Sequence, residues 1–108
     1  SNKAYSMPAR ALNTTYANSS TASCLMVMAT VRCAVTLAAG TAYVQGRSGS
    51  ANPPTISCSG LVGIQAGLLN EDNTYQIVFV VGTNTNYIIT SSTTNGTTVL
   101  GQWWELVF

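Results

Sequence analysis

The acidic residues and the absence of histidine bear first on whether this chain could catalyse a reaction. Without histidine the chain lacks the commonest general base, and no Ser-His-Asp or Cys-His arrangement can form. The acids are Glu71, Asp72 and Glu105. Glu71 and Asp72 are adjacent in a turn-like Asn-Glu-Asp-Asn run, whereas a glycosidase needs two carboxylates that face one bond about 5–9.5 Å apart. We therefore expect no catalytic residues and no enzymatic activity in this domain.

The cysteines offer neither a metal site nor a disulfide framework. There are three of them, Cys24, Cys33 and Cys58, and no two form a C-x-x-C pair. The simplest interpretation is three small buried thiols in a protein that folds in a reducing compartment. We expect no metal and no cofactor.

Aromatic residues beside amides and a guanidinium group are the side chains best suited to binding. Aromatic rings pack on the C–H faces of sugars, while amide and guanidinium groups bind their hydroxyls. Alternation in the last strand assigns Trp104 to the core with Leu100 and Leu106, and Trp103 to the polar side. For Trp103 a subunit contact is an equally good interpretation, and each tyrosine could instead be an ordinary strand residue. The candidate glycan-binding residues are Trp103, Tyr43, Tyr87, Arg47, Asn84 and Asn86.

Composition excludes two kinds of partner. Charged residues make up 6% of the chain, against about 25% in an ordinary domain. A net charge of +1 without a basic cluster argues against nucleic acid. The longest apolar stretch, 24–39, is interrupted by Thr30 and Arg32 and is shorter than the ~20 residues that a membrane helix needs, so we expect no membrane insertion. A surface with so few charges is typical of structural and adhesive assemblies.

The hydrophobic pattern predicts strands. Every odd position in 25–37 is apolar, and many of these residues are β-branched, which favours a strand over a helix. Residues 74–81 repeat the pattern and are expected to form a hairpin with 87–90. Further strands are predicted at 11–16, 41–45, 55–65 and 98–107. The pattern predicts one all-β domain over 1–108, a single antiparallel, jelly-roll-like β-sandwich of about seven strands.

Two of these strands are apolar on both faces. The residues on the face opposite the main core stripe are Met26, Met28, Val78 and Val80. The outer face of an isolated sandwich is normally polar, so these four are candidate oligomer-interface residues. A loop that covers the strands locally would explain them equally well.

Three stretches of the sequence form a familiar pattern. They are RALNTTYAN at 10–18, NTYQIVFVV at 73–81 followed by a strand at Tyr87, and LGQWWEL at 100–106. In this order they resemble a small C-terminal module of bacteriophage tail fibres and tailspikes, with its R-x-L-N-x-x-Y-x-N opening, T-Y-x-V-x-F-x-V-P-x-G-x-x-Y hairpin and W-x-E-L end. This chain has 82–86, GTNTN, where that family usually has Pro-x-Gly. The carried-over positions, largely fold-defining, are Asn13, Tyr16, Tyr75, Phe79, Tyr87, Trp103 and Glu105.

The resemblance implies a module that trimerises at the tip of a fibre and grips the bacterial surface. The partners would then be two further copies in a homotrimer and a host-surface polysaccharide or lipopolysaccharide. The protein would fold in the bacterial cytoplasm and reside in the virion tail, as the C-terminal module of a longer chain. The alternative is a structural trimerisation cap, with recognition or depolymerisation in a domain upstream. Exposure of Trp103 in the oligomer favours glycan binding, and its burial between subunits favours the cap.

Overall fold

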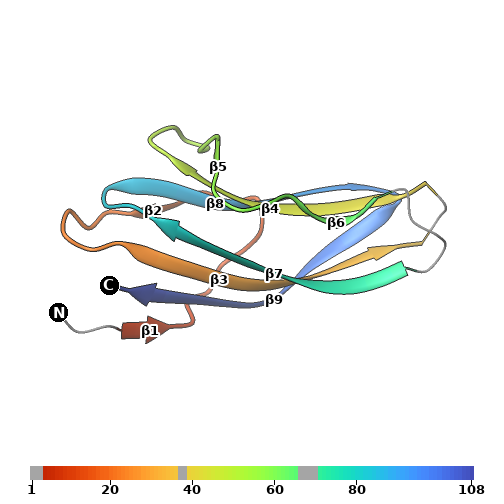
Figure 1. Ribbon diagram of the computed structural model, residues 1–108, viewed down its shortest axis with the longest axis horizontal. Helices are drawn as coiled ribbons and strands as arrows, with labels where there is room; N and C mark the ends of the chain where they lie inside the picture. The colour runs from red at the N-terminus through yellow and green to blue at the C-terminus, as the bar shows by residue number, and fades with distance from the viewer. Residues whose placement is uncertain (1–3, 37–38, 66–70) are drawn as a thin grey trace.

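Two antiparallel sheets packed face to face make up the structure, a computed structural model that describes residues 4–36, 39–65 and 71–108 (Figure 1). The strands are β1 (Ala4–Ser6), β2 (Tyr16–Asn18), β3 (Leu25–Val35), β4 (Thr41–Gly49), β5 (Ile56–Ser57), β6 (Val62–Ile64), β7 (Glu71–Val81), β8 (Thr85–Thr94) and β9 (Gly96–Val107). Sheet A has the order β1-β9-β3-β7, and sheet B has the order β2-β8-β4-β5 with β6 also paired to β4. The predicted fold class, an antiparallel β-sandwich, is confirmed. No helix long and apolar enough to cross a membrane occurs in the described ranges.

Alternating apolar residues build the core from both sheets. β3 buries every odd residue and leaves its even residues partly or fully exposed, as its sequence predicts. β7 buries Ile77, Phe79 and Val81 in the same way. The ring of Phe79 reaches across to sheet B, where a Cβ on Gly46 would come within 2.5 Å of it, so a glycine is needed at this contact.

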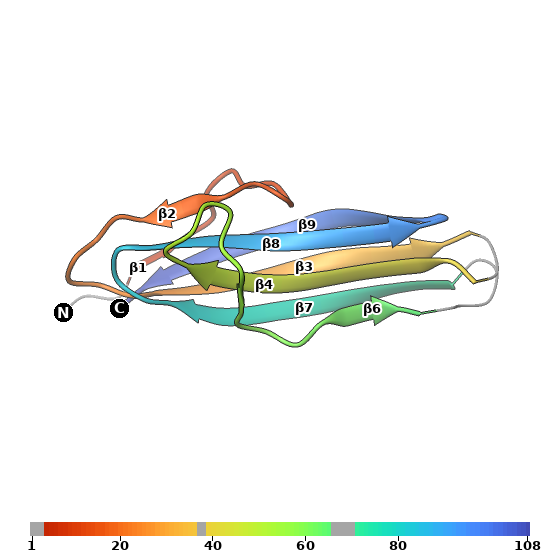
Figure 2. The ribbon, with the colours of Figure 1, turned by 90° about the horizontal axis from the view of Figure 1, so that it is seen from above.

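β7 and β8 are consecutive but do not form the predicted hairpin. β7 pairs with β3 in sheet A, whereas β8 pairs with β4 and β2 in sheet B. Both strands have an apolar face that needs the core, and the connection at 82–84 is long enough to cross the ~10 Å between packed sheets. Asn84 in this connection has a φ of 50°, and its N–H donates to the Ser20 carbonyl at 2.8 Å. The crossing is visible at one end of the sandwich in Figure 2.

The shorter strands differ most from the predictions. The strand expected at 11–16 is mostly a loop, and β2 begins only at Tyr16. Asn13 explains the difference: it has a φ of 58° and its side chain bonds both the N–H and the hydroxyl of Ser91 on β8. Residues 55–65 form two short strands, β5 and β6, and β1 was not predicted at all. Leu37, the last residue of the first predicted strand, lies outside the described residues.

Candidate functional site

An irregularity in β9 decides where the two tryptophans point. The pairing with β3 advances two residues along β3, from Ala29 to Val31, while it moves three residues along β9, from Trp103 to Leu100. One extra residue in β9 is the signature of a β-bulge. The bulge reverses the alternation, so that Leu100 before it and Trp103 after it both face the core.

Thr30 holds this bulge in place. Its hydroxyl accepts a hydrogen bond from the Gln102 N–H at 3.0 Å. The same hydroxyl lies only 2.7 Å from where a Cβ on Gly101 would be, so residue 101 is a glycine because no side chain fits there. The local sequence Gly101-Gln102 therefore allows the reversal that strict alternation does not predict.

Trp103 is buried, which corrects its expected place on the polar side. Only 3% of Trp103 is exposed, and its indole N–H donates to Glu105 at 3.0 Å. The Tyr87 hydroxyl donates to the same Glu105 oxygen at 2.7 Å, and the Arg10 Nε donates to it at 3.2 Å. The Arg10 guanidinium also lies over the Tyr16 ring, 4.4 Å from its centre. We call these five residues the Glu105 network.

The Glu105 network is fully bonded and closed. Glu105 itself is buried, and no described buried side-chain N or O atom lacks a hydrogen-bond partner. Burial first, and then the hydrogen bond to Glu105, raise the pKa of Tyr87 to about 12. The network ties the segment around Arg10 and Tyr16 to β8 and β9, so its role is to hold the fold.

The six predicted glycan-binding residues are not brought together. Trp103 and Tyr87, with 3% and 1% of their surface exposed, cannot offer a ring face to a ligand. Tyr87 is buried because β8 belongs to sheet B and turns this residue inward. Tyr43 and Arg47 are half-buried on β4, where alternation directs them away from the buried Ala42 and Val44.

The two asparagines among the candidates occupy different settings. Asn84 is exposed in the connection between the sheets. Asn86 is half-buried and its amide donates to the carbonyls of Ser50 and Ala51. The Asn86 amide thus holds the 50–51 segment, and neither asparagine shares a groove with the buried Trp103.

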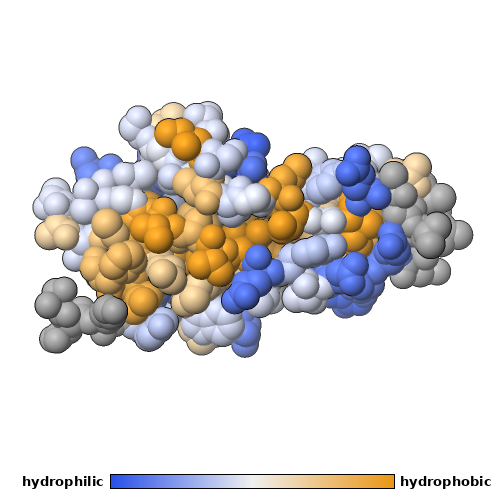
Figure 3. Space-filling model, viewed as in Figure 1, coloured by the Kyte–Doolittle hydropathy of each residue, from blue (hydrophilic) through white to orange (hydrophobic). Residues whose placement is uncertain are grey.

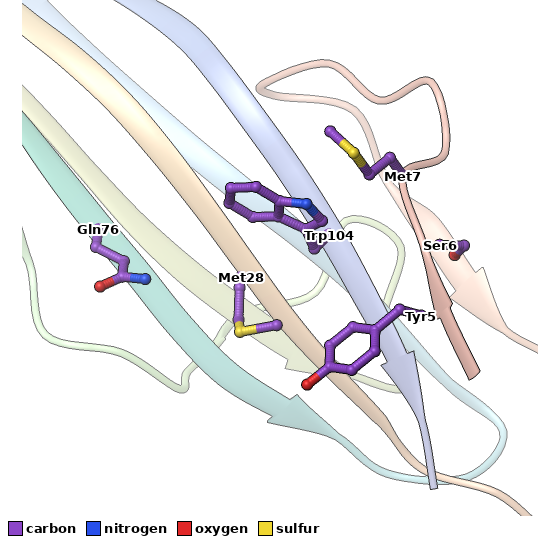
Figure 4. Close-up of a pocket in the computed structure, with 6 residues that line it drawn as sticks. All are labelled: Tyr5, Ser6, Met7, Met28, Gln76 and Trp104. Carbon is purple, nitrogen blue, oxygen red and sulfur yellow. The ribbon is translucent and has the colours of Figure 1, made fainter. Parts of the chain in front are cut away.

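Trp104, assigned to the core from the sequence, instead faces outward from sheet A. It is half-buried and lies opposite Met28 on β3. An open pocket of about 500 Å³ lies beside it, lined by Tyr5, Ser6, Met7, Met28, Gln76 and Trp104. Figure 4 shows these side chains arranged across the sheet, from Gln76 on β7 past Met28 on β3 and Trp104 on β9 to the segment of β1. We call this feature the Trp104 pocket.

The polar groups of the Trp104 pocket have no protein partner. The Trp104 indole N–H, the Gln76 amide and the side-chain hydroxyls of Tyr5 and Ser6 form no hydrogen bond with any residue that the structure describes. Tyr5 is 70% exposed. Aromatic faces, thioethers and free hydrogen-bonding groups therefore meet in one place that solvent can reach.

The candidate interface residues adjoin this pocket on the same outer face. Met26 lies opposite Val80, and Met28 lies opposite Val78. The valines are 46% and 49% exposed, and the methionines are half-buried, so all four face away from the core as the sequence predicts. In Figure 3 apolar residues gather toward one end and the middle of the molecule, while hydrophilic residues gather toward the other end. The role of these two methionines and two valines as a subunit interface stays a prediction.

The cysteines are only partly as expected. Cys33 is buried, and burial raises the pKa of its thiol, whereas Cys24 and Cys58 are half-exposed. The Cys58 sulfur lies 2.7 Å from the Ser48 hydroxyl. All three are free thiols, and the described residues contain no cluster of His, Cys, Asp and Glu that could hold a metal ion.

Comparison with known proteins gives no relative of this chain. No family model, curated protein or solved structure matches this chain. The resemblance to tail-fibre modules stays a hypothesis that rests on the sequence motifs. Residues from all three motif stretches meet in the Glu105 network, namely Arg10, Tyr16, Tyr87, Trp103 and Glu105. The motifs therefore describe how this fold is held, and the pocket that could bind a ligand lies outside them except for Trp104 and Gln76.

Proposed function

We propose that this chain is a receptor-binding module of a phage tail fibre or tailspike, which forms a homotrimer in the virion and binds host-surface glycan. The observation that carries the proposal is the Trp104 pocket. It combines ring faces from Trp104 and Tyr5 with the unpartnered amide of Gln76. Sugars present C–H faces to aromatic rings and hydroxyls to amides, so this combination suits a saccharide.

The surroundings of Glu105 and Asp72 support glycan binding over glycan hydrolysis. Glu105 is buried and bonded to three donors, while Asp72 is paired with Arg32 on the outer face of sheet A. Neither Glu105 nor Asp72 is among the residues that line the Trp104 pocket. A module of this kind would hold a glycan for an activity located elsewhere in its parent chain.

A structural trimerisation cap is the second candidate, and a specific observation favours it. The apolar surface continues from the pocket through Met28 to Val78 and Val80, on the strand that ends sheet A. Exposed apolar surface of this kind usually marks a contact site. In the cap hypothesis the neighbouring subunits cover both the valines and the pocket.

Replacement of Trp104 by alanine tests glycan binding directly. Loss of a central aromatic anchor costs about 2 kcal/mol or more, so we expect about a thirtyfold weaker affinity per site. Across three linked sites, adsorption to susceptible cells should be nearly lost because avidity multiplies the effect. Tyr43→Ala is the matched control, since it removes an aromatic ring from the outer face of the other sheet. Equal adsorption by wild type and Trp104→Ala would contradict the proposal.

Replacement of Val80 by aspartate tests the subunit contact. A charge placed in a buried apolar interface costs several kcal/mol, so the variant should sediment as single chains while wild type sediments as trimers. Thr83→Asp, at an exposed position in the connection after β7, is the control for the added charge itself. A wild-type chain that sediments as a monomer would contradict the trimer. If Trp104→Ala also dissociates the trimer, the cap hypothesis replaces the glycan proposal.

A further inference from the structure

The described residues that line the Trp104 pocket carry no charge. Its six residues supply two aromatic rings, two thioethers, one amide and the hydroxyls of Tyr5 and Ser6. No Lys, Arg, Asp or Glu is among them. The polar atoms available to a ligand are therefore neutral donors and acceptors, namely the Trp104 N–H, the Gln76 amide and the two hydroxyls.

Two described charges on the same face, those of Arg32 and Asp72, are paired with each other. Arg32 on β3 is two residues beyond Thr30, which lies opposite Gln76, and its guanidinium is paired with Asp72 on β7. Arg32 lowers the pKa of Asp72, so the carboxylate stays ionised and bound to it at neutral pH. Glu105 on β9 neighbours Trp104 but faces inward and is bonded to Arg10. Among the described residues, the pocket offers no cation to offset the lost hydration of an anionic ligand and no carboxylate to a cationic one.

The two methionines put a thioether on either side of Trp104 (Figure 4). Met28 lies between Gln76 and Trp104 across the sheet, and Met7 extends from the segment after β1 toward Trp104 (Figure 4). Thioether side chains are flexible and apolar, so they adapt to a methyl group and offer nothing to a hydroxymethyl group or a carboxylate. A sugar with a methyl group at C6 matches this lining better than one with an oxygen there.

We propose that the Trp104 pocket takes an uncharged 6-deoxyhexose unit, an inference that rests on the proposed glycan binding. The ring face of the sugar packs on Trp104, its hydroxyls bond the Gln76 amide and the Trp104 N–H, and its methyl group contacts the thioether of Met28. Burial of one methyl-sized group is worth about a fourfold gain in affinity over the 6-hydroxy sugar. A 6-carboxylate should bind about tenfold more weakly, because no group in the pocket pairs with it.

The test compares methyl glycosides that differ only at C6. The methyl, hydroxymethyl and carboxylate members of the gluco, galacto and manno series are titrated into ¹⁵N-labelled protein, up to about 10 mM, ten times a dissociation constant of about 1 mM. The two indole N–H signals are assigned with Trp103→Phe and Trp104→Phe. We expect the 6-deoxy member of at least one series to move the Trp104 signal at the lowest concentration. The Trp103 signal should stay fixed, because that indole is bonded to Glu105.

Two results would overturn the inference, and parallel adsorption assays separate it from the proposed function. The inference fails if, in every series, the hydroxymethyl or carboxylate member moves the Trp104 signal at lower concentration than its 6-deoxy partner. It also fails if no glycoside moves that signal. In either case, adsorption that still depends on Trp104 leaves the proposed function standing. Adsorption that is unchanged by Trp104→Ala removes the proposed function as well.

Discussion

Trp103 and Trp104 are neighbours in one strand, yet they lie in opposite kinds of environment. The indole of Trp103 is buried, bonded to Glu105 and edge-on to the Tyr16 ring at 5.9 Å. The indole of Trp104 is half-buried beside an open pocket, and its N–H has no partner among the described residues. A side chain whose polar group is already satisfied stabilises the fold. One whose polar group is free in an accessible pocket is available to a ligand.

Hydrogen bonding, more than residue type, separates the structural role of Trp103 from the binding role proposed for Trp104. Both regions are rich in aromatic rings, and both include a side chain from the N-terminal segment, Arg10 in the network and Tyr5 in the pocket. In the network Arg10, Tyr87 and Trp103 all donate to the buried Glu105 carboxylate. In the pocket the donors face solvent.

Alanine replacements at the two tryptophans should differ clearly in how far they lower the free energy of unfolding. Trp103→Ala leaves a cavity and removes a donor from Glu105, so we expect it to lower the free energy of unfolding by about 3–5 kcal/mol. Trp104→Ala removes a ring that is partly in solvent, and we expect about 1 kcal/mol or less. Urea unfolding followed by circular dichroism measures both. Equal losses would show that the two indoles do not differ in role as described here.

High pH should weaken the Glu105 network. The pKa of Tyr87 is raised from 10.0 to about 12 in the folded protein. A raised folded pKa adds stability below the unfolded value of about 10, and this stability is lost as the pH rises toward 12. The shift corresponds to about 2–3 kcal/mol. The free energy of unfolding should therefore fall between pH 10 and about 12, and Tyr87→Phe should make that fall shallower. An unchanged slope in Tyr87→Phe would rule out Tyr87 as the titrating group.

A change at the bulge should lower the free energy of unfolding less than Trp103→Ala or the titration of Tyr87 does. A Cβ on Gly101 would meet the Thr30 hydroxyl at 2.7 Å, so Gly101→Ala should cost about 1–2 kcal/mol. Thr30→Ala removes the clashing hydroxyl together with its bond from Gln102. The double variant should therefore cost less than the sum of the two single variants, which a double-mutant cycle measures. Strict additivity would mean that Thr30 does not set the position of the bulge.

Periodicity predicted much of the fold because it reports which face of a strand is buried. The odd residues of β3 and the inward residues of β7 follow it without exception. It does not report which sheet a strand joins, so it predicts a hairpin of β7 and β8 although their connection crosses between sheets. The short strand β1 has too few residues for any periodic signal.

The candidate site was less predictable because one inserted residue exchanges the faces of Trp103 and Trp104, which follow it. Alternation across the last strand placed Trp103 outside and Trp104 inside, and the bulge at Gly101-Gln102 exchanged them. The signal that could have warned of this was the glycine itself, since a glycine inside a strand often marks a bulge. The pocket depends further on the pairing of β1 with β9, which joins residues about a hundred positions apart and leaves no local trace.

The seam between β1 and β9 gives the pocket a mechanical property. Among the described residues three pairs form it, Ala4–Val107, Tyr5–Leu106 and Ser6–Glu105, and the strands are antiparallel. A pull on the chain before Ala4, directed away from β9, loads these pairs one after another, so the seam peels open under small force. Because Tyr5, Ser6 and Met7 line one side of the pocket, peeling dismantles it, and a bound ligand that spans both strands resists the peeling. A pulling force on the N-terminal segment and a bound ligand would therefore act on the same three residues, Tyr5, Ser6 and Met7.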